Sequence, residues 1–598
     1  MACNKLPSFA VACVVIGVAV SPVGAHADPG ASYGKPPIGA PLQKYLSRIA
    51  RRTIRDALLQ RQAYHPDYVP SALKTVNGEA VVRLWRDGFL QATGVGGPGP
   101  VVYCVTRAAS VAAASLKQGK REVSASDASE MTLEVEIAGK PVALSFDGDW
   151  TQPGALSGVV EPGVDGLIVT GKFKGRRVYP SELIWRGLAL HEALTGLAKA
   201  TQSDPTNRGA TKLARFTTVH WVQDQSGADT QELIRGMVLQ RGDSMALEGL
   251  SEAIDALTEY VLYRQRPDGL FSYEFHPGAN RYVESDDLLH QLGATAALAQ
   301  CANLTGRETV RAAVDLSLRF HRRGLQTIPG LDGAAFLATA DQSNPLGATA
   351  LLSLALTVHP RPQEYAAVRE QLVVGILSLQ RKSGMFLTAF PPAVTLNQQD
   401  YFPGEALFAL ASQYAVSPSP RVLGAFDRAL GFYRDYFRAN RSPAFLAWQV
   451  RAFSLMAKQT NRRDFAEFAF ELADAIAAAQ LDASNSRWPA LYGGVRFGSN
   501  DRPGASTSMY LAALCDAVRV ARMIGDHERA ARYLGFIRAA TRFVIQLQFR
   551  KAEAFFVKSP QDAVGGIRTS PSLNRLRIDH AVHALAALLM ARRVLYTS

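Results

Sequence analysis

The stretch Gly293-Ala-Thr-Ala-Ala-Leu-Ala-Gln300 recurs in similar form at Gly347-Ala-Thr-Ala-Leu-Leu-Ser-Leu354, Gly404-Glu-Ala-Leu-Phe-Ala-Leu-Ala411 and Ala581-Val-His-Ala-Leu-Ala-Ala-Leu588. All four are rich in small residues and apolar nearly all the way round a helix, which is typical of a buried helix. Segments between them, such as Arg421–Arg438, carry Arg and Asp on one face instead. The alternation predicts apolar inner helices surrounded by amphipathic outer helices.

Helix-period segments come in pairs over residues 236–598, and most connections alternate between short and long. Twelve such segments occur, at 244–265, 287–302, 307–323, 345–358, 362–381, 403–415, 421–438, 443–458, 462–480, 505–525, 527–549 and 578–597. Six helical hairpins that close on themselves form an (α/α)6 toroid, and an open solenoid of helical pairs is the alternative. We predict the closed toroid, because six pairs close such a ring. The long loops gather at one end, where binding and catalysis tend to sit.

The N-terminal residues 1–27 have the pattern of a secretory signal peptide. Lys5 supplies a basic start, Phe9–Val20 is an apolar run too short to span a membrane, and Ala25-His-Ala27 is a small-x-small cleavage site. An uncleaved anchor is the alternative. We expect a bacterial protein that is periplasmic or secreted, without stable membrane insertion after cleavage, and a linker over residues 28–40.

Charge and cysteine content restrict the partners and cofactors. The formal net charge of +13 favours acidic partners, although a general basic bias without function explains it equally well. No nucleic-acid-binding motif accompanies the charge, so we expect an acidic polysaccharide or a membrane surface as the partner and no nucleic acid.

Beyond the signal, Cys104, Cys301 and Cys515 lack metal-ligand spacing. We therefore expect no disulfide, no metal and no cofactor.

Residues 41–205 mix helix and strand signals and predict an α+β domain, followed by a linker over residues 206–235. An amphipathic helix is expected over Leu42–Gln62. Strands are expected at Ala80–Leu84, Met131–Ile137 and Leu167–Val169.

This region resembles the AMMECR family. The resemblance is carried by Leu46-Ser-Arg-Ile-Ala-Arg-Arg-Thr-Ile54, Ala80-Val-Val-Arg-Leu-Trp-Arg-Asp-Gly-Phe-Leu90, Glu161-Pro-Gly-Val-Asp-Gly-Leu-Ile168 and Tyr179-Pro-Ser-Glu182. The family's Leu-Arg-Gly-Cys-Ile-Gly block is missing, and Leu90-Gln-Ala-Thr-Gly-Val-Gly96 lies in its place. The resemblance therefore implies the fold of this family more than any activity that depends on that block.

Residues 236–598 resemble the C-terminal helical domain of glucuronyl carbon-5 epimerases. The motifs are Gln265-Arg-Pro-Asp-Gly-Leu-Phe-Ser-Tyr-Glu-Phe-His276, Glu284-Ser-Asp-Asp-Leu-Leu-His-Gln291, Tyr401-Phe-Pro-Gly-Glu405, Gly565-Gly-Ile-Arg568 and Arg575-Leu-Arg-Ile-Asp-His-Ala-Val-His583. They are also similar to unsaturated-glucuronyl hydrolases, polysaccharide lyases and sugar 2-epimerases. The resemblance implies a toroid that acts on glycans and leaves the reaction open, because this scaffold hosts many chemistries.

The candidate site is the mouth of the toroid, where the inner helices would begin and their free N–H groups would favour negative charge. The predicted catalytic residues are Glu405, His290, Tyr401, Asp579 and His583. The predicted substrate-binding residues are Asp286, Asp287, Trp448, Arg575, Arg577 and Tyr510. Aromatic rings stack on sugars, Arg binds a uronate carboxylate, and Glu, His or Tyr moves protons.

Each of these residues also has a purely structural interpretation. Asp286 and Asp579 are good helix N-caps, and Trp448 could serve packing alone. Glu405 is the strongest catalytic candidate, because a carboxylate inside an apolar helix is costly unless it is used or paired.

Two functions follow from this pattern. The first is an exported enzyme that modifies a polysaccharide, as an epimerase, a lyase or a glycoside hydrolase. The alternative is a non-catalytic carbohydrate-binding or scaffold protein in exopolysaccharide assembly.

Overall fold

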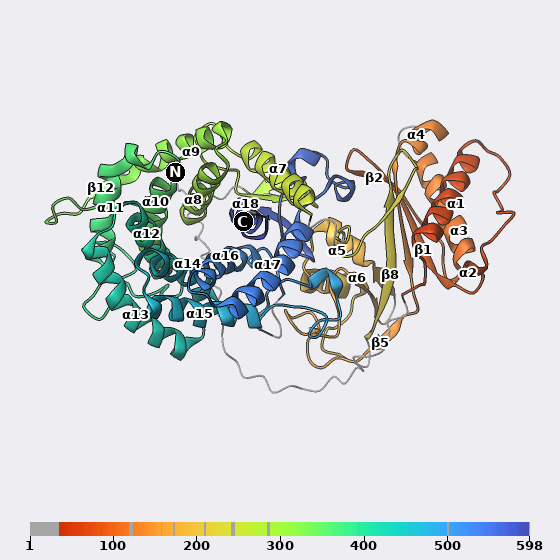
Figure 1. Cartoon of the computed structure of the whole chain (residues 1–598). Coiled ribbons are helices and arrows are strands. Elements are labelled where there is room, and N and C mark those ends of the chain that lie inside the picture. The colour runs from red at the N-terminus through yellow and green to blue at the C-terminus, as the bar shows by residue number, and fades with distance from the viewer. Residues whose placement is uncertain are drawn as a thin grey trace, which may run out of the picture.

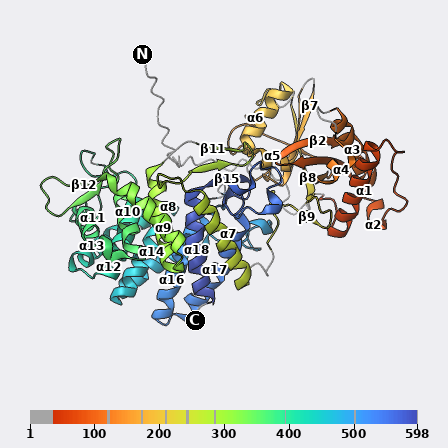
Figure 2. The same ribbon diagram turned by 90° about the horizontal axis from the view of Figure 1, so that it is seen from above.

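The computed structural model describes residues 35–596 except 119–122, 157, 172–173, 208–210, 241–245, 284–286, 394 and 499–501. Figure 1 shows a mixed architecture, with a twisted sheet and its helices beside a ring of helices. Figure 2 shows the same two parts side by side from above. The predicted signal peptide lies outside the described residues. No helix in the described chain is long and apolar enough to cross a membrane.

The first part is built on an antiparallel sheet with the strand order β2-β1-β4-β8-β6-β7. Its strands are β1 (Asn77–Arg86), β2 (Phe89–Val95), β3 (Gly99–Pro100), β4 (Thr132–Ala138), β5 (Val142–Leu144), β6 (Asp165–Thr170), β7 (Gly175–Val178), β8 (Lys212–Gln223) and β9 (Thr230–Glu232). Its helices are α1 (Ala40–Leu58), α2 (Ser71–Lys74), α3 (Val101–Lys117), α4 (Ala125–Ser129), α5 (Pro180–Arg186) and α6 (Leu190–Thr201). The expected helix Leu42–Gln62 overlaps α1, which ends at Leu58, and the three expected strands overlap β1, β4 and β6.

The sheet packs against two hydrophobic cores. In the first, α1 and α3 pack together over β1 and β2 and bury residues such as Leu46, Val82 and Ala108. In the second, α6 packs near β6 and β7 and buries Leu167 and Leu194. Because side chains alternate along a strand, Val219 and Leu213 of β8, which belong to the first and the second core, lie on the same face of the sheet.

Two strands of this sheet lie within the residues expected to form a linker, 206–235. β8 is its longest strand and pairs with β4 on one side and β6 on the other, while β9 pairs with β8. The segment Phe216-Thr-Thr-Val-His-Trp-Val222 is rich in β-branched and aromatic residues, which favour a central strand. The linker prediction was wrong because this signal was overlooked.

The second part is a ring of twelve helices within residues 246–596. The inner helices are α8 (Leu288–Thr305), α10 (Leu346–Val358), α12 (Phe402–Val416), α14 (Pro443–Thr460), α16 (Thr507–Met523) and α18 (Ile578–Tyr596). The outer helices are α7 (Leu247–Tyr263), α9 (Glu308–His321), α11 (Ala366–Ser378), α13 (Pro420–Asn440), α15 (Arg463–Ala478) and α17 (His527–Leu547). Consecutive inner helices contact one another and α18 contacts α8, so the ring is closed. The open solenoid is therefore excluded.

The composition of the inner helices explains their position. Nearly every side chain of α10 is buried, and the stretch Ala581–Leu588 in α18 is also buried apart from a partly exposed His583. Small residues let the inner helices approach closely, and the apolar faces of the outer helices cover them. One continuous hydrophobic core runs through the whole ring.

Short strands lie among the long loops at one end of the ring. They are β10 (Glu274–His276), β11 (Arg281–Val283), β12 (Leu325–Thr327), β13 (Ala335–Leu337), β14 (Arg568–Ser570) and β15 (Leu573–Arg577). Four of them form a sheet in the order β11-β10-β15-β14. Pairing of Glu274 with Arg577 joins the first long loop of the ring to the last.

The sheet and the ring are in direct contact. The side-chain amide of Asn574 in β15 donates to the backbone oxygen of Ile184 in α5 at 3.0 Å. Arg502, in a ring loop, forms an ion pair with Glu161 at 2.5 Å. Trp85 of β1 is buried in the same core as the ring helices. The three cysteines of the described chain are buried and unpaired.

Candidate functional site

A bidentate ion pair lies where the last long loop enters the ring. Arg577, the final residue of β15, donates from Nε and Nη2 to the two carboxylate oxygens of Asp579 at 3.0 and 2.7 Å. Asp579 is the second residue of α18 rather than its N-cap, so the predicted capping role is wrong. Burial alone would raise the pKa of Asp579, but the charges of His580 and Arg577 hold it far below its ordinary value. Asp579 is therefore ionised.

His290, in the first turn of α8, links this pair to the neighbouring loop. Its Nε2 accepts a hydrogen bond from Arg577 Nη2 at 3.0 Å and lies 3.8 Å from Asp579 Oδ2. Its Nδ1 lies 3.2 Å from both the Tyr273 hydroxyl and Asp287 Oδ1. Because an arginine N–H only donates, the proton of the neutral imidazole lies on Nδ1.

Two carboxylates set the charge state of His290. Burial opposes its protonation, but the hydrogen bond to Asp287 and the charge of Asp579 raise its pKa above the ordinary value. Asp287 caps α8 by accepting from the backbone N–H of His290, and its own pKa is lowered chiefly by the hydrogen bond with the imidazole. Asp287 is therefore an ionised, partly exposed carboxylate at the mouth of the ring.

Glu405, in the first turn of α12, is the carboxyl group with the most unusual environment. Burial raises its pKa to about 7, and His290 is the only charged group near enough to oppose this shift measurably within the described chain. Its side chain is partly exposed, whereas its Oε2 atom is buried and makes no hydrogen bond with the described residues. At neutral pH a substantial fraction of Glu405 keeps its proton.

The close approach of two inner helices fixes the position of Glu405. A Cβ atom at Gly347 of α10 would lie 2.4 Å from Glu405 Oε2 and 2.7 Å from Phe402 Cδ1. No side chain fits in that space, so only glycine allows the carboxyl group to lie against α10.

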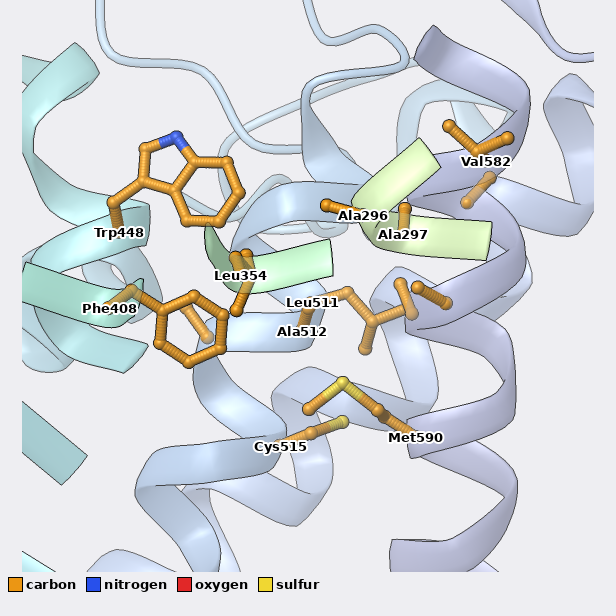
Figure 3. Close-up of a cluster of buried hydrophobic side chains, with 14 of the residues drawn as sticks. Ala296, Ala297, Leu354, Phe408, Trp448, Leu511, Ala512, Cys515, Val582 and Met590 are labelled. Atoms are coloured by element: carbon orange, nitrogen blue, oxygen red, sulfur yellow. The ribbon is translucent and has the colours of Figure 1, made fainter. Parts of the chain in front are cut away.

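A small, mostly apolar cavity lies between the inner helices. Trp448, Arg451 and His583 line it together with alanines of α8, and its volume is about 20 Å³, room for about one water molecule. Figure 3 shows Trp448 beside Phe408 in the buried cluster inside the ring. Burial lowers the pKa of His583 to about 4, so this imidazole is neutral.

The structure brings together some of the predicted site residues and separates others. His290, Asp287, Arg577 and Asp579 form one hydrogen-bonded cluster, and Glu405 is electrostatically coupled to His290. His583 and Trp448 lie next to each other, with ring centroids 6.1 Å apart.

The remaining predicted residues have other surroundings. The Tyr401 side chain is exposed just before α12, Tyr510 packs against Phe497, and Arg575 lies 4.0 Å from Glu192 of α6. Arg575 therefore faces the first part of the chain. Asp286 lies outside the described residues.

Sequence reasoning missed Arg451; it placed His580 in the mouth and Tyr273 beside it, and assigned neither of them a role. Tyr273 hydrogen-bonds His290 and lies beneath the Arg577 guanidinium, 5.2 Å from it. Arg451 is buried in α14 and binds Asp516 and Gln300 across the ring, both at 3.1 Å. A single arginine within an apolar inner helix was a signal that could have pointed to Arg451.

The cluster contains the elements of acid–base chemistry. Glu405 is a carboxyl group that retains a proton near neutral pH, and Asp287 and Asp579 are carboxylates that do not. Carboxyl groups whose surroundings separate their pKa values are how a site combines a general acid with a general base. Within the described chain, no group of three or more His, Cys, Asp or Glu side chains is arranged to hold a metal ion.

Comparisons with known proteins place this chain in no family. No protein-family model matches it, and no curated protein matches it. The resemblance to the AMMECR family therefore stays a prediction, as does that to glucuronyl epimerases.

Three solved structures illustrate the similarities that exist. An α-1,6-mannanase, GH76A of Salegentibacter sp. HEL1_6, is 10% identical with a TM-score of 0.42, and the match covers 58% of this chain and 99% of that chain. An unsaturated glucuronyl hydrolase specific for heparin is 12% identical with a TM-score of 0.41, covering 58% and 97%. An uncharacterised protein from Pyrococcus horikoshii is 20% identical with a TM-score of 0.29, covering 33% and 98%. No reaction is transferred to this chain from these matches.

Proposed function

We propose that the mouth of the ring is the active site of an exported enzyme that modifies a polysaccharide. The observation that carries this proposal is Glu405, a carboxyl group with a pKa raised to about 7 at the end of an apolar helix, close to a cluster of ionised carboxylates. Such a group is costly to the fold, and a general acid that works near neutral pH needs this pKa. The signal-like residues 1–27 support export. We also propose that the α+β region, residues 41–205, is an AMMECR-like domain.

Each residue of the cluster has a role in this proposal. In hydrolysis, Glu405 donates a proton to the leaving oxygen of a glycosidic bond. In epimerisation, Glu405 exchanges a proton with carbon 5 of a uronate. Asp287, ionised and partly exposed, is the matching base. The ion pair of Arg577 with Asp579 positions His290, and Tyr273 stabilises the imidazole from its other side.

An acidic sugar is the favoured substrate. Arg577 uses Nε and Nη2 to bind Asp579, and its Nη1 makes no hydrogen bond with any described residue. This N–H group is available to a uronate carboxylate, and charge-assisted hydrogen bonds of this kind are strong. The remaining hydroxyl groups of the sugar would meet Asp287 and Tyr273.

The test combines one variant with one matched control. Glu405→Gln keeps the shape of the side chain and removes its titrating proton, whereas Glu248→Gln makes the same exchange at an exposed position of α7. Heparosan-, alginate- and pectin-like polymers are incubated with each protein. New reducing ends report hydrolysis, unsaturated-uronate absorbance reports elimination, and solvent deuterium at carbon 5 reports epimerisation.

We expect turnover by the wild type and by Glu248→Gln, and a loss of at least about 100-fold in Glu405→Gln, the usual contribution of a general acid. Equal turnover by Glu405→Gln and wild type would refute the assignment of Glu405.

A non-catalytic carbohydrate-binding protein is the second candidate, favoured by the small cavity below the mouth. Its volume of about 20 Å³ holds no sugar ring, so a polymer would have to lie across the mouth. This candidate predicts polymer binding without any of the three products. It also predicts that Glu405→Gln leaves binding unchanged, while Arg577→Ala weakens it.

A further inference from the structure

A second cavity, separate from the mouth of the ring, lies between α1 and α4. Its volume is about 410 Å³, within the range of small-molecule binding sites. The two helices contact each other at the end of the molecule away from the ring (Figure 1). Ile54 of α1, Leu84 of β1, and Ala125 and Ala128 of α4 give the cavity an apolar surface. It shares no residue with the mouth of the ring.

Every charged side chain that lines this cavity in the described chain is an arginine. The four are Arg48, Arg51, Arg52 and Arg55, and Ser129 is the remaining polar residue. Their spacing of three or four residues places them on one face of α1, along about 10 Å of helix. A hollow lined by cations of one sign attracts an anionic ligand.

The acidic residues near the cavity neutralise only part of this charge. Arg48 is exposed and forms no ion pair within the described chain. Asp127 and Glu130 do not line the cavity, and both bind Arg86, at 3.1 and 3.5 Å. Asp56 is a single carboxylate shared by three arginines at 3.6, 3.5 and 3.8 Å, namely Arg52, Arg55 and Arg61.

Arg51 is held in place by uncharged acceptors. Its Nε donates to Gln223 Oε1 at 2.7 Å, and its Nη atoms donate to backbone oxygens between 2.8 and 3.3 Å away, those of Ser129, Met131, Gln223 and Asp224. Burial lowers the pKa of Arg51, and the charge of Asp224 opposes this shift. Because its donors are already used, Arg51 acts on a ligand through its charge alone.

The other three arginines have donors to spare. The Nη atoms of Arg48, Arg52 and Arg55 make no hydrogen bond with any described residue, and about half of the side chains of Arg52 and Arg55 is exposed, 51% and 53%. A guanidinium group binds a carboxylate with two parallel N–H groups. Three such groups in a row along a helix therefore fit a ligand that carries several carboxylates in a row.

We propose that this cavity binds a run of uronate residues of an acidic polysaccharide, with their carboxylates on Arg48, Arg52 and Arg55 and their rings against the apolar surface. The identity of this ligand rests on the proposed function, whereas the site itself does not. A sugar chain can enter a hollow, but a membrane surface meets groups that protrude, so the cavity favours the polysaccharide. A long polymer held here stays close to the ring, which raises its local concentration at the mouth.

The test is a chemical footprint of the full chain. Phenylglyoxal modifies exposed arginines, and mass spectrometry of the peptides shows which ones. We expect tetragalacturonate to protect Arg48, Arg52 and Arg55, and to leave Arg538, an exposed arginine of α17, unprotected. Maltotetraose, which is uncharged, should protect none of them. Galacturonate should need a concentration at least about tenfold higher, because one carboxylate gains nothing from the neighbouring arginines.

Two matched variants measure the affinity at this site alone. The concentration of tetragalacturonate that halves the modification of Arg55 should rise at least about fivefold in Arg48→Gln, the size expected for one lost charge-assisted hydrogen bond. Arg538→Gln removes the same charge from another helix and should leave this concentration unchanged. Because Arg48 contacts no carboxylate of the fold, its replacement leaves the ion pairs of Asp56 intact.

Three outcomes would each overturn the proposal. They are no protection by tetragalacturonate, equal or stronger protection by inorganic tetraphosphate or by phosphatidylglycerol vesicles, and an unchanged half-protection concentration in Arg48→Gln.

The footprint also separates this proposal from the one for the mouth. It is repeated with Glu405→Gln, whose cavity between α1 and α4 is unaltered, so that turnover does not consume the probe. Protection of the α1 arginines without any product from the wild type would refute the enzyme and leave this site standing. Turnover without protection would refute this site alone.

Discussion

Replacing Glu405 with glutamine should change the stability of the fold in a way that depends on pH. The ordinary pKa of the carboxyl group is 4.5, and burial raises it to about 7 in the folded chain. Below pH 4.5 the group is protonated in both the folded and the unfolded chain, so it favours neither. Between pH 4.5 and 7 the unfolded chain releases the proton and the folded chain does not, so the folded state loses stability as pH rises.

The separation of the two pKa values corresponds to at most about 3 kcal/mol, and partial exposure of the side chain reduces this to about 2 kcal/mol. Glutamine does not titrate. The free energy of unfolding of Glu405→Gln, measured relative to wild type, should therefore increase by about 2 kcal/mol from pH 4.5 to pH 7 and stay constant above.

Urea unfolding followed by far-ultraviolet circular dichroism measures this difference, because the ring helices dominate that signal. Glu248→Gln provides the control and should show no such trend, since Glu248 is exposed. A difference between Glu405→Gln and wild type that stays flat from pH 4.5 to 7 would show that Glu405 ionises normally. The acid proposed for the mouth would then be lost as well.

Three further outcomes are expected. Gly347→Ala should destabilise the ring by about 2 kcal/mol in urea unfolding, because its Cβ would displace Glu405. The control Gly431→Ala, whose Cβ would have nothing within 4 Å, should stabilise α13 by up to about 1 kcal/mol. Equal effects of the two substitutions would refute the steric argument. Asp579→Asn should cost about 2 kcal/mol by the same assay, because it leaves Arg577 without its bidentate carboxylate, and a cost below about 0.5 kcal/mol would contradict this. Mass spectrometry of the exported protein should find its N-terminus near Asp28, and an intact Met1 on cytosolic protein would contradict the signal peptide.

The ring could be predicted from sequence because the composition of each helix and the lengths of its loops can be read from neighbouring residues. Each inner helix is marked by small apolar residues, and each pair is separated by loops of alternating length, so all twelve expected segments overlap helices of the structure. The position of β8 was missed because the β-branched and aromatic run within it was overlooked. The charged cluster could be predicted only in part, because partners such as Tyr273 and Arg577 are distant in sequence and meet only through the pairing of β10 with β15.

The pairing of α18 with α8 also has a consequence for biosynthesis. The helix that closes the ring is the last one along the described chain, so the opposing faces of α8 and α16 remain uncovered until residues 578–596 have been synthesised. A nascent chain held just short of this point would present two long apolar edges to the solvent, and such edges attract chaperones or other nascent chains. For this architecture, the core is completed only when α18 has been synthesised. A stop codon shortly before Ile578 should therefore yield aggregates rather than a shortened ring, and sedimentation of the truncated product would show it.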